Sequence, residues 1–362
     1  FEGNAVSYVS TAALDEKGFW SAQEAESEPF ISRMVVLRPE RDEDFNGTVV
    51  MEWFNVSGGL DAGPDFTQMH TEIMREGYAW VGVSAQFVGV EGGGAIDLSL
   101  KVVDPERYGM LSHPGDSFAY DIFSQAAQAV RNPLGLDPTD GLSVERIIAV
   151  GQSQSAFFLT TYVNAVLPLV DTFDGFIIHS RGNGAGPLSQ APQVPVPAPE
   201  NVFTRTDLPQ PVIVLQTETD IFRLGSAAVR QPDAEHYRLW EVAGSAHSDL
   251  YTTKKGPVDR GDDAAVADVI ADVEPRPPFI ICNKAVNDGP GHWLAKAALA
   301  AVDRWILDGT AATSAPLLGL TPDNTAFALD EHGNVIGGIR TPYVDAPVAV
   351  FSGEGQPAGD SI

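Results

Sequence analysis

The sequence is poor in cysteine and in positive charge, and it has no long apolar run. Cys282 is the only cysteine among 362 residues, so neither an intrachain disulfide nor a thiolate metal cluster can form. Lys and Arg number 22 against 49 Asp and Glu, which gives a formal net charge of −27, and no basic cluster is present to neutralise phosphates. Apolar stretches stay well below the roughly 18 residues that cross a bilayer. We therefore expect no nucleic-acid partner, no membrane insertion and no metal.

The remaining composition is typical of one large α/β domain. Hydrophobic residues make up 44% of the chain and charged residues 20%, which is enough for a sizeable core. Strand-like segments alternate with helix-like segments, a pattern typical of a mostly parallel central sheet flanked by helices. The expected strands are 48–53, 78–85, 146–150, 174–181, 211–217 and 236–242, and the expected helices are 64–76, 116–131, 156–166 and 292–307. Residues 5–13 and 31–39 are expected to form an antiparallel edge of the same sheet.

Two long segments lack regular periodicity. Residues 182–210, rich in proline and glycine, lie between two expected core strands and are predicted to form a lid over the site and not a core element. Residues 311–362 are predicted to form a C-terminal extension without a helix and with a hairpin turn at 330–334. An acidic run at 259–274 is interpreted as a solvated face, because it lacks the residue spacing of a calcium loop. All of these segments are assigned to a single domain over residues 1–362.

One stretch carries the clearest chemical signal in the sequence. A strand-like apolar segment is followed by Gly151-Gln152-Ser153-Gln154-Ser155, one letter away from the G-x-S-x-G nucleophile elbow. In that sharp strand-to-helix turn the residues two before and two after the serine must be small, and Gly151 and Ser155 both are. The turn would expose the Ser153 hydroxyl and direct the Gln154 backbone N–H at a developing oxyanion. The alternative is an ordinary helix N-terminus that Ser153 only caps.

A second oxyanion donor is expected on the loop after strand 48–53. That strand runs into the segment Phe54-Asn55-Val56-Ser57-Gly58-Gly59, and the corresponding loop of α/β-hydrolases supplies a backbone N–H. The two candidates are Asn55 and Val56, and a plain turn is the alternative interpretation.

A serine nucleophile needs a base and a carboxylate that orients the base. Among the seven histidines, His247 alone combines a loop of small residues with a position after the last expected strand. The acid is Glu218 or Asp220, which both follow strand 211–217 directly. Strand alternation would point both side chains the same way, so it does not decide between them. The register of the strand and the shorter side chain favour Asp220, and Glu218 is then a partner of the triad or the alternative acid.

The strand expected beside that of the nucleophile ends in two further polar side chains. His179 and Arg181 should lie at the carboxyl end of the sheet, where open α/β sheets place their sites. Both are therefore candidates for the rim of the substrate pocket. A purely structural role is the alternative, and for His179 it is the favoured one.

Several segments together resemble the bacterial "alpha/beta hydrolase domain" family of serine hydrolases. The similarity runs over nearly the whole chain, and it is most specific around the elbow and the histidine. The segments that carry it are NGTVVMEWFNVSGGLDAGPDF, DPERYGMLSHPGDSFAYDIFSQAAQAVR, VGQSQSAFFLTTYVNAV, VLQTETD, LWEVAGSAHSD and GGIRTPYVDAPVAVFSG. The resemblance implies an α/β-hydrolase fold, Ser153 as nucleophile, His247 as base and the hydrolysis of carboxylic esters. Ser155 departs from the wider superfamily, which has glycine there.

The expected function is that of a serine esterase acting on a small-molecule ester without a cofactor. A lactonase, an amidase or an acyltransferase would use the same residues, and a non-catalytic binding protein on a hydrolase fold is the rival from another class. The acyl and alcohol groups and the oligomeric state stay open. The chain begins with Phe1 and not with Met, so either a signal segment has been removed or the sequence has been trimmed. We favour an exported bacterial protein, periplasmic or secreted, over a cytoplasmic one.

Overall fold

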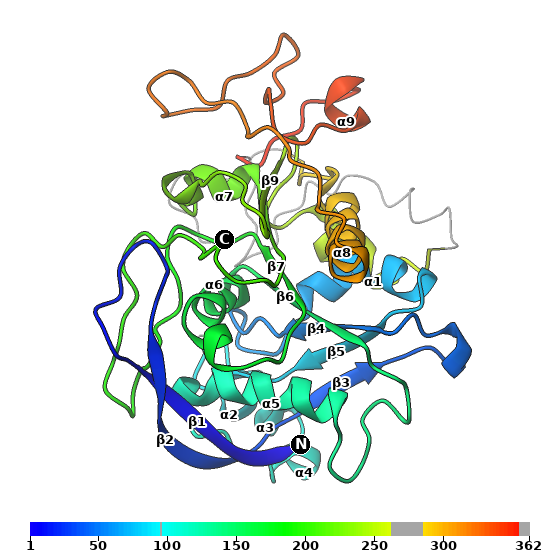
Figure 1. Cartoon of the computed structure of the whole chain (residues 1–362). Coiled ribbons are helices and arrows are strands. Elements are labelled where there is room, and N and C mark those ends of the chain that lie inside the picture. The colour runs from blue at the N-terminus through cyan, green and yellow to red at the C-terminus, as the bar shows by residue number, and fades with distance from the viewer. Residues whose placement is uncertain (95, 262–284, 355–362) are drawn as a thin grey trace.

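The computed structural model describes residues 1–94, 96–261 and 285–354. Cys282 and residues 262–274 of the acidic run lie outside these ranges. In the described part, the chain forms a seven-stranded sheet with the order β3-β5-β4-β6-β7-β8-β9 (Figure 1). Its strands are β3 (Met34–Leu37), β4 (Thr48–Trp53), β5 (Ala79–Val83), β6 (Arg146–Gln152), β7 (Gly175–His179), β8 (Val212–Thr217) and β9 (Tyr237–Val242). Strand β3 runs antiparallel to β5 at one edge, and the other neighbours pair in parallel.

Helices cover both faces of this sheet, as the sequence predicts (Figure 1). Helices α1 (Pro64–Arg75) and α8 (Gly291–Asp308) pack on one face, and α5 (Ala119–Arg131) and α6 (Gln154–Thr161) pack on the other. Shorter helices lie in the connections and in the C-terminal extension, namely α2 (Phe87–Glu91), α3 (Leu100–Val103), α4 (Pro105–Tyr108), α7 (Glu218–Phe222) and α9 (Pro342–Asp345). Every residue of β4 and of β8 is buried, because parallel strands packed between two helix layers have no solvent face.

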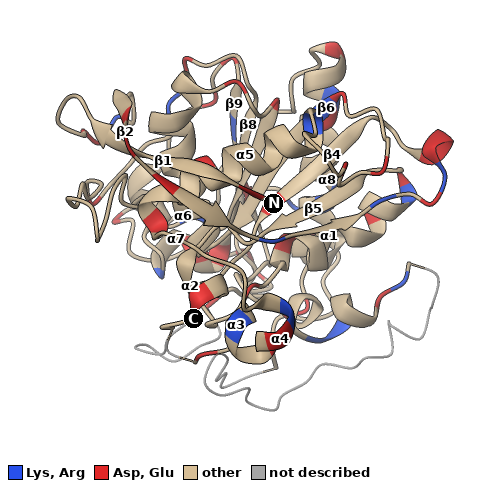
Figure 2. Ribbon diagram, turned by 90° about the horizontal axis from the view of Figure 1, so that it is seen from below, with Lys and Arg blue, Asp and Glu red and all other residues tan. Residues whose placement is uncertain are grey.

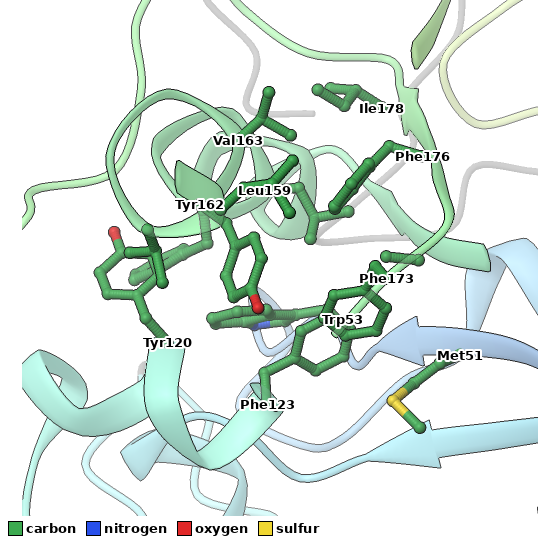
Figure 3. Packing of buried hydrophobic residues seen from close by; sticks show 14 of the residues in the cluster. Met51, Trp53, Tyr120, Phe123, Leu159, Tyr162, Val163, Phe173, Phe176 and Ile178 are labelled. Atoms are coloured by element: carbon green, nitrogen blue, oxygen red, sulfur yellow. The ribbon is translucent and has the colours of Figure 1, made fainter. Parts of the chain in front are cut away.

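The core between the sheet and the helices α5 and α6 is strongly aromatic (Figure 3). Trp53 at the end of β4 stacks on Phe158 with ring centroids 5.4 Å apart, and it lies 4.8 Å from Phe123. Phe123 in turn stacks on Phe173 at 4.9 Å. Each such pair adds about 0.5–1.5 kcal/mol beyond the burial of its area. This layer gives α6, the helix that begins directly after Ser153, a rigid support.

Of the two segments expected to form the antiparallel edge of the central sheet, only one does so. Strand β3 forms it, but residues 5–13 do not join the central sheet. Strand β1 (Glu2–Ser10) pairs instead with β2 (Ala22–Ile31) in a separate two-stranded sheet that packs on α5 (Figure 1). The sequence signal for β2 is weak, because its ten residues are mostly polar and exposed and only Phe30 is buried. Backbone pairing with β1, and not burial of a face, makes this segment a strand.

Residues 182–210 are irregular, as predicted, but they are fixed to the core. Leu188 and Val202 are fully buried in the main hydrophobic cluster, so single side chains of this segment contribute to the core although it forms no helix or strand there. Proline and glycine prevent regular structure, yet they do not prevent single apolar side chains from packing. The buried Arg181 guanidinium also holds the segment, since it donates to Thr204 Oγ1 at 3.0 Å and to the carbonyl oxygen of Val202. A role of this segment at the substrate entrance stays a prediction.

The C-terminal extension packs along the last strand of the sheet. Ile339 forms a parallel bridge with Val242 of β9, and its backbone exchanges hydrogen bonds with the residues on either side of Val242. The turn at 330–334 is present, closed by the bond from Asp330 N–H to the Asn334 carbonyl at 2.8 Å. The one-turn helix α9 contradicts the expectation of an extension without helix, because four residues are too few for helical periodicity to show.

Acidic residues are spread over many loops and helices, with fewer basic ones between them (Figure 2). Among the helices in the described ranges, none combines the length and apolarity that a membrane span requires.

Candidate active site

Ser153 lies in a sharp turn between β6 and α6. Its backbone angles are φ 61° and ψ −117°, a strained region for a residue with a side chain. Two backbone bonds hold the turn: Ser153 N–H donates to the His179 carbonyl at 2.9 Å, and the Ser153 carbonyl accepts from Phe157 N–H at 3.1 Å. The first bond continues the β6–β7 pairing up to the serine, and the second is the first helical bond. The side chain is therefore carried on rigid elements at the carboxyl edge of the sheet.

The turn is too tight for larger neighbours. A Cβ atom added to Gly151 would lie 3.0 Å from Ser155 Cβ and 3.0 Å from Leu159 Cδ1. A glycine at position 151 and a small residue at position 155 are therefore required by the turn itself. The Ser155 hydroxyl is buried and has no hydrogen-bond partner, so this serine is tolerated for its size and not for its polarity.

Three residues that the sequence singles out meet in one chain of hydrogen bonds. His247 Nε2 lies 2.9 Å from Ser153 Oγ, and His247 Nδ1 lies 2.7 Å from Asp220 Oδ1. Asp220 is fully buried and His247 nearly so, while Ser153 is partly exposed. A carboxylate on Nδ1 keeps the proton on that nitrogen, which leaves Nε2 free to accept the serine proton. The arrangement is that of an activated nucleophile with its base and its orienting acid.

The carboxylate of Asp220 is held on both of its oxygens. Oδ1 faces His247, while Oδ2 accepts from Thr217 N–H at 2.7 Å and from the Thr217 hydroxyl at 2.8 Å. Thr217 is the residue before helix α7, and Asp220 is its third residue, so the pair forms a capping box. The sequence carries this signal as Thr-x-x-Asp, a capping pattern that sequence reasoning missed.

Glu218 points away from the histidine. Its Oε1 accepts from Gly244 N–H at 2.6 Å and its Oε2 accepts from Gly353 N–H at 2.9 Å. Burial raises the pKa of this carboxyl to about 7, although the two backbone donors oppose the shift. Glu218 and Asp220 diverge because they belong to a helical turn, where residues two apart are rotated by about 200°. Strand alternation does not apply to them, since the strand ends at Thr217 and both residues lie in the helical turn that follows.

Two backbone N–H groups are candidates for stabilising an oxyanion near Ser153. Gln154 N–H is the first of helix α6, as the elbow predicts. On the loop after β4, Asn55 N–H is already bonded to the Ala62 carbonyl at 2.9 Å. Val56 N–H makes only a long contact of 3.5 Å with Gln154 Oε1. It can therefore exchange this contact for a hydrogen bond to a stronger acceptor, such as an oxyanion. The geometry therefore favours Val56 over Asn55 as the second donor.

Asn55 has a different place in the site. Its side-chain amide donates to the Gln152 carbonyl at 3.0 Å, which joins the loop after β4 to the residue before the nucleophile. The Gln152 side chain in turn donates to the His247 carbonyl at 2.9 Å. Through these two side-chain amides, the loop after β4, the turn at Ser153 and the loop that carries His247 are connected. Neither contact shows in the sequence, because each joins segments about a hundred residues apart.

The structure places His179 and Arg181 in the interior of the protein. Both side chains are buried, with 2% of each residue exposed. His179 Nδ1 pairs with Asp65 Oδ1 at 2.8 Å, on the α1 side of the sheet. Arg181 binds Thr204 and carbonyl oxygens of the segment 182–210, and burial lowers its pKa to about 10. This placement favours the structural interpretation of both residues, and a role of either one at the substrate pocket stays a prediction.

No group of three or more His, Cys, Asp and Glu side chains capable of holding a metal ion occurs in residues 1–94, 96–261 and 285–354. The site around Ser153 consists of a serine hydroxyl, an imidazole, a carboxylate and backbone N–H groups, which are the groups that serine-dependent acyl transfer uses.

Comparison with known proteins places this site in a family. The sequence matches the family model described as "Alpha/beta hydrolase domain" over residues 1–362. The chain belongs to this family. The α/β-hydrolase fold and the family that the sequence indicates are thereby confirmed, and the protein is a hydrolase of the α/β family. No curated protein matches the sequence.

Solved structures of similar fold are distant in sequence. A carboxylesterase from Lactobacillus plantarum is 15% identical, with 85% of this chain and 99% of that chain covered and a TM-score of 0.41. Esterase 2 from Thermogutta terrifontis is 16% identical over 65% of this chain and 84% of that chain, with a TM-score of 0.37. A serine hydrolase without lid from Xanthomonas campestris is 14% identical over 73% and 93%, with a TM-score of 0.36.

Proposed function

We propose that this protein is a serine hydrolase that cleaves small carboxylic esters through an acyl-enzyme intermediate. One observation carries the proposal: the continuous hydrogen-bond chain of 2.9 Å and 2.7 Å that joins Ser153 Oγ, the His247 ring and Asp220 Oδ1. A serine hydroxyl is a weak nucleophile near neutral pH, and this chain supplies the base that it lacks. The mechanism requires no cofactor.

In the first half-reaction, Ser153 Oγ attacks the ester carbonyl carbon while its proton passes to His247 Nε2. The carbonyl oxygen takes up the negative charge, and the N–H groups of Gln154 and Val56 are the donors proposed to stabilise it. When the tetrahedral intermediate collapses, the bond to the alkoxy oxygen breaks. His247 returns the proton to that oxygen, so the alcohol leaves neutral.

In the second half-reaction, water takes the place of the alcohol. His247 removes a proton from the water, which attacks the acyl carbon, and the same proton is then given to Ser153 Oγ as the acyl bond breaks. The free acid is released and the serine is regenerated. Asp220 stabilises the imidazolium that forms twice in each cycle, and its own protonation state does not change.

The test is hydrolysis of short-chain chromogenic esters by purified protein, together with labelling by a fluorophosphonate. Ser153→Ala should lower kcat by about 10⁴–10⁶-fold and abolish labelling, because the nucleophile is lost. Ser155→Ala is the matched control: it removes a buried serine hydroxyl two residues away that has no partner. The control variant should keep both kcat and labelling. Full turnover by the Ser153→Ala variant would contradict the proposal.

The same preparation separates the alternatives that share these residues. Lactones, anilides and an added alcohol acceptor are tested beside the ester at equal concentration. A kcat/KM for the lactone or the anilide above that for the ester would reassign the activity to a lactonase or an amidase. Transfer of the acyl group to the alcohol faster than to water would make the protein an acyltransferase. A protein that is neither labelled nor active would be a binding protein.

A further inference from the structure

The C-terminal extension meets both loops that carry the partners of Ser153. The acid follows strand β8 in helix α7, and the histidine follows strand β9 in the loop at 243–249. Between them lies the last described part of the chain, residues 351–354. We define the hydrogen bonds among Glu218, Gly244 and Gly353 as the tail clamp.

Glu218 is the centre of the tail clamp. It is fully buried, and each of its carboxylate oxygens accepts one backbone N–H: Gly244 N–H from the histidine loop at 2.6 Å and Gly353 N–H from the extension at 2.9 Å. Glu218, which lies on the same helical turn as Asp220, therefore joins the histidine loop to the C-terminal extension at Gly353. When this carboxyl is ionised, both bonds are charge-assisted, and such bonds are roughly twice as strong as neutral ones.

Thr219 connects the same three segments from the next position. Its hydroxyl donates to the Gly353 carbonyl at 2.7 Å and accepts from His247 N–H at 3.1 Å. Because the same hydroxyl group bonds both residues, a displacement of Gly353 would also move the backbone of His247. Asn287 adds a further connection, since its side-chain amide donates to the carbonyls of Ser352 at 2.9 Å and Gly244 at 3.2 Å.

The contact leaves no room for adjustment. A Cβ atom on Gly353 would lie 2.6 Å from Thr219 N, 2.7 Å from Glu218 Cβ and 2.7 Å from the Ser245 carbonyl oxygen. Gly244 has φ +75°, and a Cβ atom there would lie 2.7 Å from Val344 of the extension. A side chain at position 353 would therefore collide with the acid turn and the histidine loop, and one at position 244 would collide with the extension, so each contact requires a glycine.

We infer that the C-terminal extension is part of the catalytic apparatus: Glu218 and Gly353 are positioning residues that hold the acid turn and the histidine loop in register. This inference rests on the proposed function of Ser153, His247 and Asp220. It gives Glu218 a role in catalysis although its carboxylate touches neither His247 nor the nucleophile. It also explains why the extension pairs with β9 through Ile339 just before the histidine loop begins.

Two variants and one control test the tail clamp in the full-length protein. Glu218→Gln keeps the shape of the side chain but turns one oxygen into an NH₂ group that opposes an N–H donor. Gly353→Ala introduces the Cβ atom that has no space. Glu354→Gln is the control for charge, because it removes an exposed carboxylate whose charge acts on Glu218 but whose side chain makes none of the clamp's hydrogen bonds.

The readouts are kcat and KM for the chromogenic ester, the thermal midpoint, and the NMR signal of the proton between His247 Nδ1 and Asp220. Both clamp variants should lower kcat about 10- to 100-fold with KM within twofold, as expected when reacting groups are displaced by less than about 1 Å. Their downfield proton signal should shift or broaden. Glu354→Gln should change neither. If one clamp variant fails to fold, the other still gives the result.

Folded clamp variants with wild-type kcat and an unchanged proton signal would overturn the inference. Equal losses in the control would also overturn it, because the effect would then be one of charge. Failure of the proposed function looks different: wild-type protein would neither hydrolyse esters nor react with the fluorophosphonate. In that case the proton signal alone decides, and an undisturbed signal in both variants refutes the tail clamp.

Discussion

Replacement of Asp220 by asparagine should disable the base while leaving the hydrogen-bond frame almost intact. The asparagine amide has one acceptor and one donor end, and Thr217 decides how it is oriented. Thr217 N–H lies 2.7 Å from Oδ2 and can only donate. An NH₂ group there would place two donors against each other, so the amide oxygen must face Thr217 and the NH₂ must face His247 Nδ1.

That orientation forces the wrong tautomer on the histidine. Nδ1, which lies 2.7 Å from position 220, must then accept a hydrogen bond, so the ring proton moves to Nε2. A protonated Nε2 points its hydrogen at Ser153 Oγ and cannot take the serine proton. Loss of the correct tautomer typically lowers kcat by about 10⁴-fold. This corresponds to roughly 5 kcal/mol in the activation barrier, at about 1.4 kcal/mol for each factor of ten.

The assay compares Asp220→Asn with wild-type protein and with Glu218→Gln in the same ester hydrolysis. Thermal midpoints within a few degrees would show that the variants are folded. The ¹⁵N shifts of the His247 ring report which nitrogen carries the proton. We expect the proton on Nδ1 in the wild type and on Nε2 in Asp220→Asn, with a much smaller loss of kcat in Glu218→Gln.

Two results would refute this reasoning. A folded Asp220→Asn variant that keeps more than about a tenth of wild-type kcat would show that the acid does not set the tautomer. A larger loss in Glu218→Gln than in Asp220→Asn would transfer the acid role to Glu218. The roles of Ser153 and His247 would stand in either case.

Three more predictions concern the elbow, the pH dependence of stability and the irregular segment. Gly151→Ala should lower the free energy of unfolding, measured by urea titration, by about 1–3 kcal/mol, because the new methyl group clashes with Ser155 Cβ. The double variant with Ser155→Gly should recover part of that loss, and simple addition of the two effects would contradict this explanation. Burial raises the pKa of Glu218 to about 7 and that of Asp249 to about 6. The folded state therefore holds protons that the unfolded state releases above about pH 4–4.5. The thermal midpoint should fall as pH rises from about 6.5 to 8, above the range in which the lowered pKa values of the buried His113 and His292 act in the opposite direction; a rising midpoint would refute this. Arg181→Lys should lower the midpoint by several degrees with little effect on kcat, because an ammonium cannot reach the oxygens that the guanidinium spans; an unchanged midpoint would show that these bonds contribute nothing.

Local signals predicted most of the sheet and the position of the proposed nucleophile. Strand β4 matches its expected range, because burial between two helix layers leaves an apolar run in the sequence. Helices α1 and α8 agree within one residue at each end. Ser153 was predictable because the elbow constrains neighbours within two residues of it. His247 was predictable because few histidines follow an expected strand.

Long-range contacts explain what the sequence could not show. The choice of Val56 over Asn55 depends on a backbone partner at Ala62 that occupies one N–H and leaves the other. The strand β2 has no apolar face and exists because β1 pairs with it. The separation of Glu218 from Asp220 follows from a helix that begins at position 218, a boundary that propensity alone does not fix.

Arg181 gives the irregular segment 182–210 a dependence on the rest of the chain that its sequence conceals. The guanidinium is satisfied by neutral oxygen atoms, mainly backbone carbonyls of the segment itself. A homologous enzyme or an engineered variant that shortened the segment while keeping this arginine would leave a buried cation without acceptors, a change that typically costs several kcal/mol. Arginine and segment are therefore expected to be gained, lost or exchanged together, and a transplant of the segment onto another hydrolase has to carry position 181 with it.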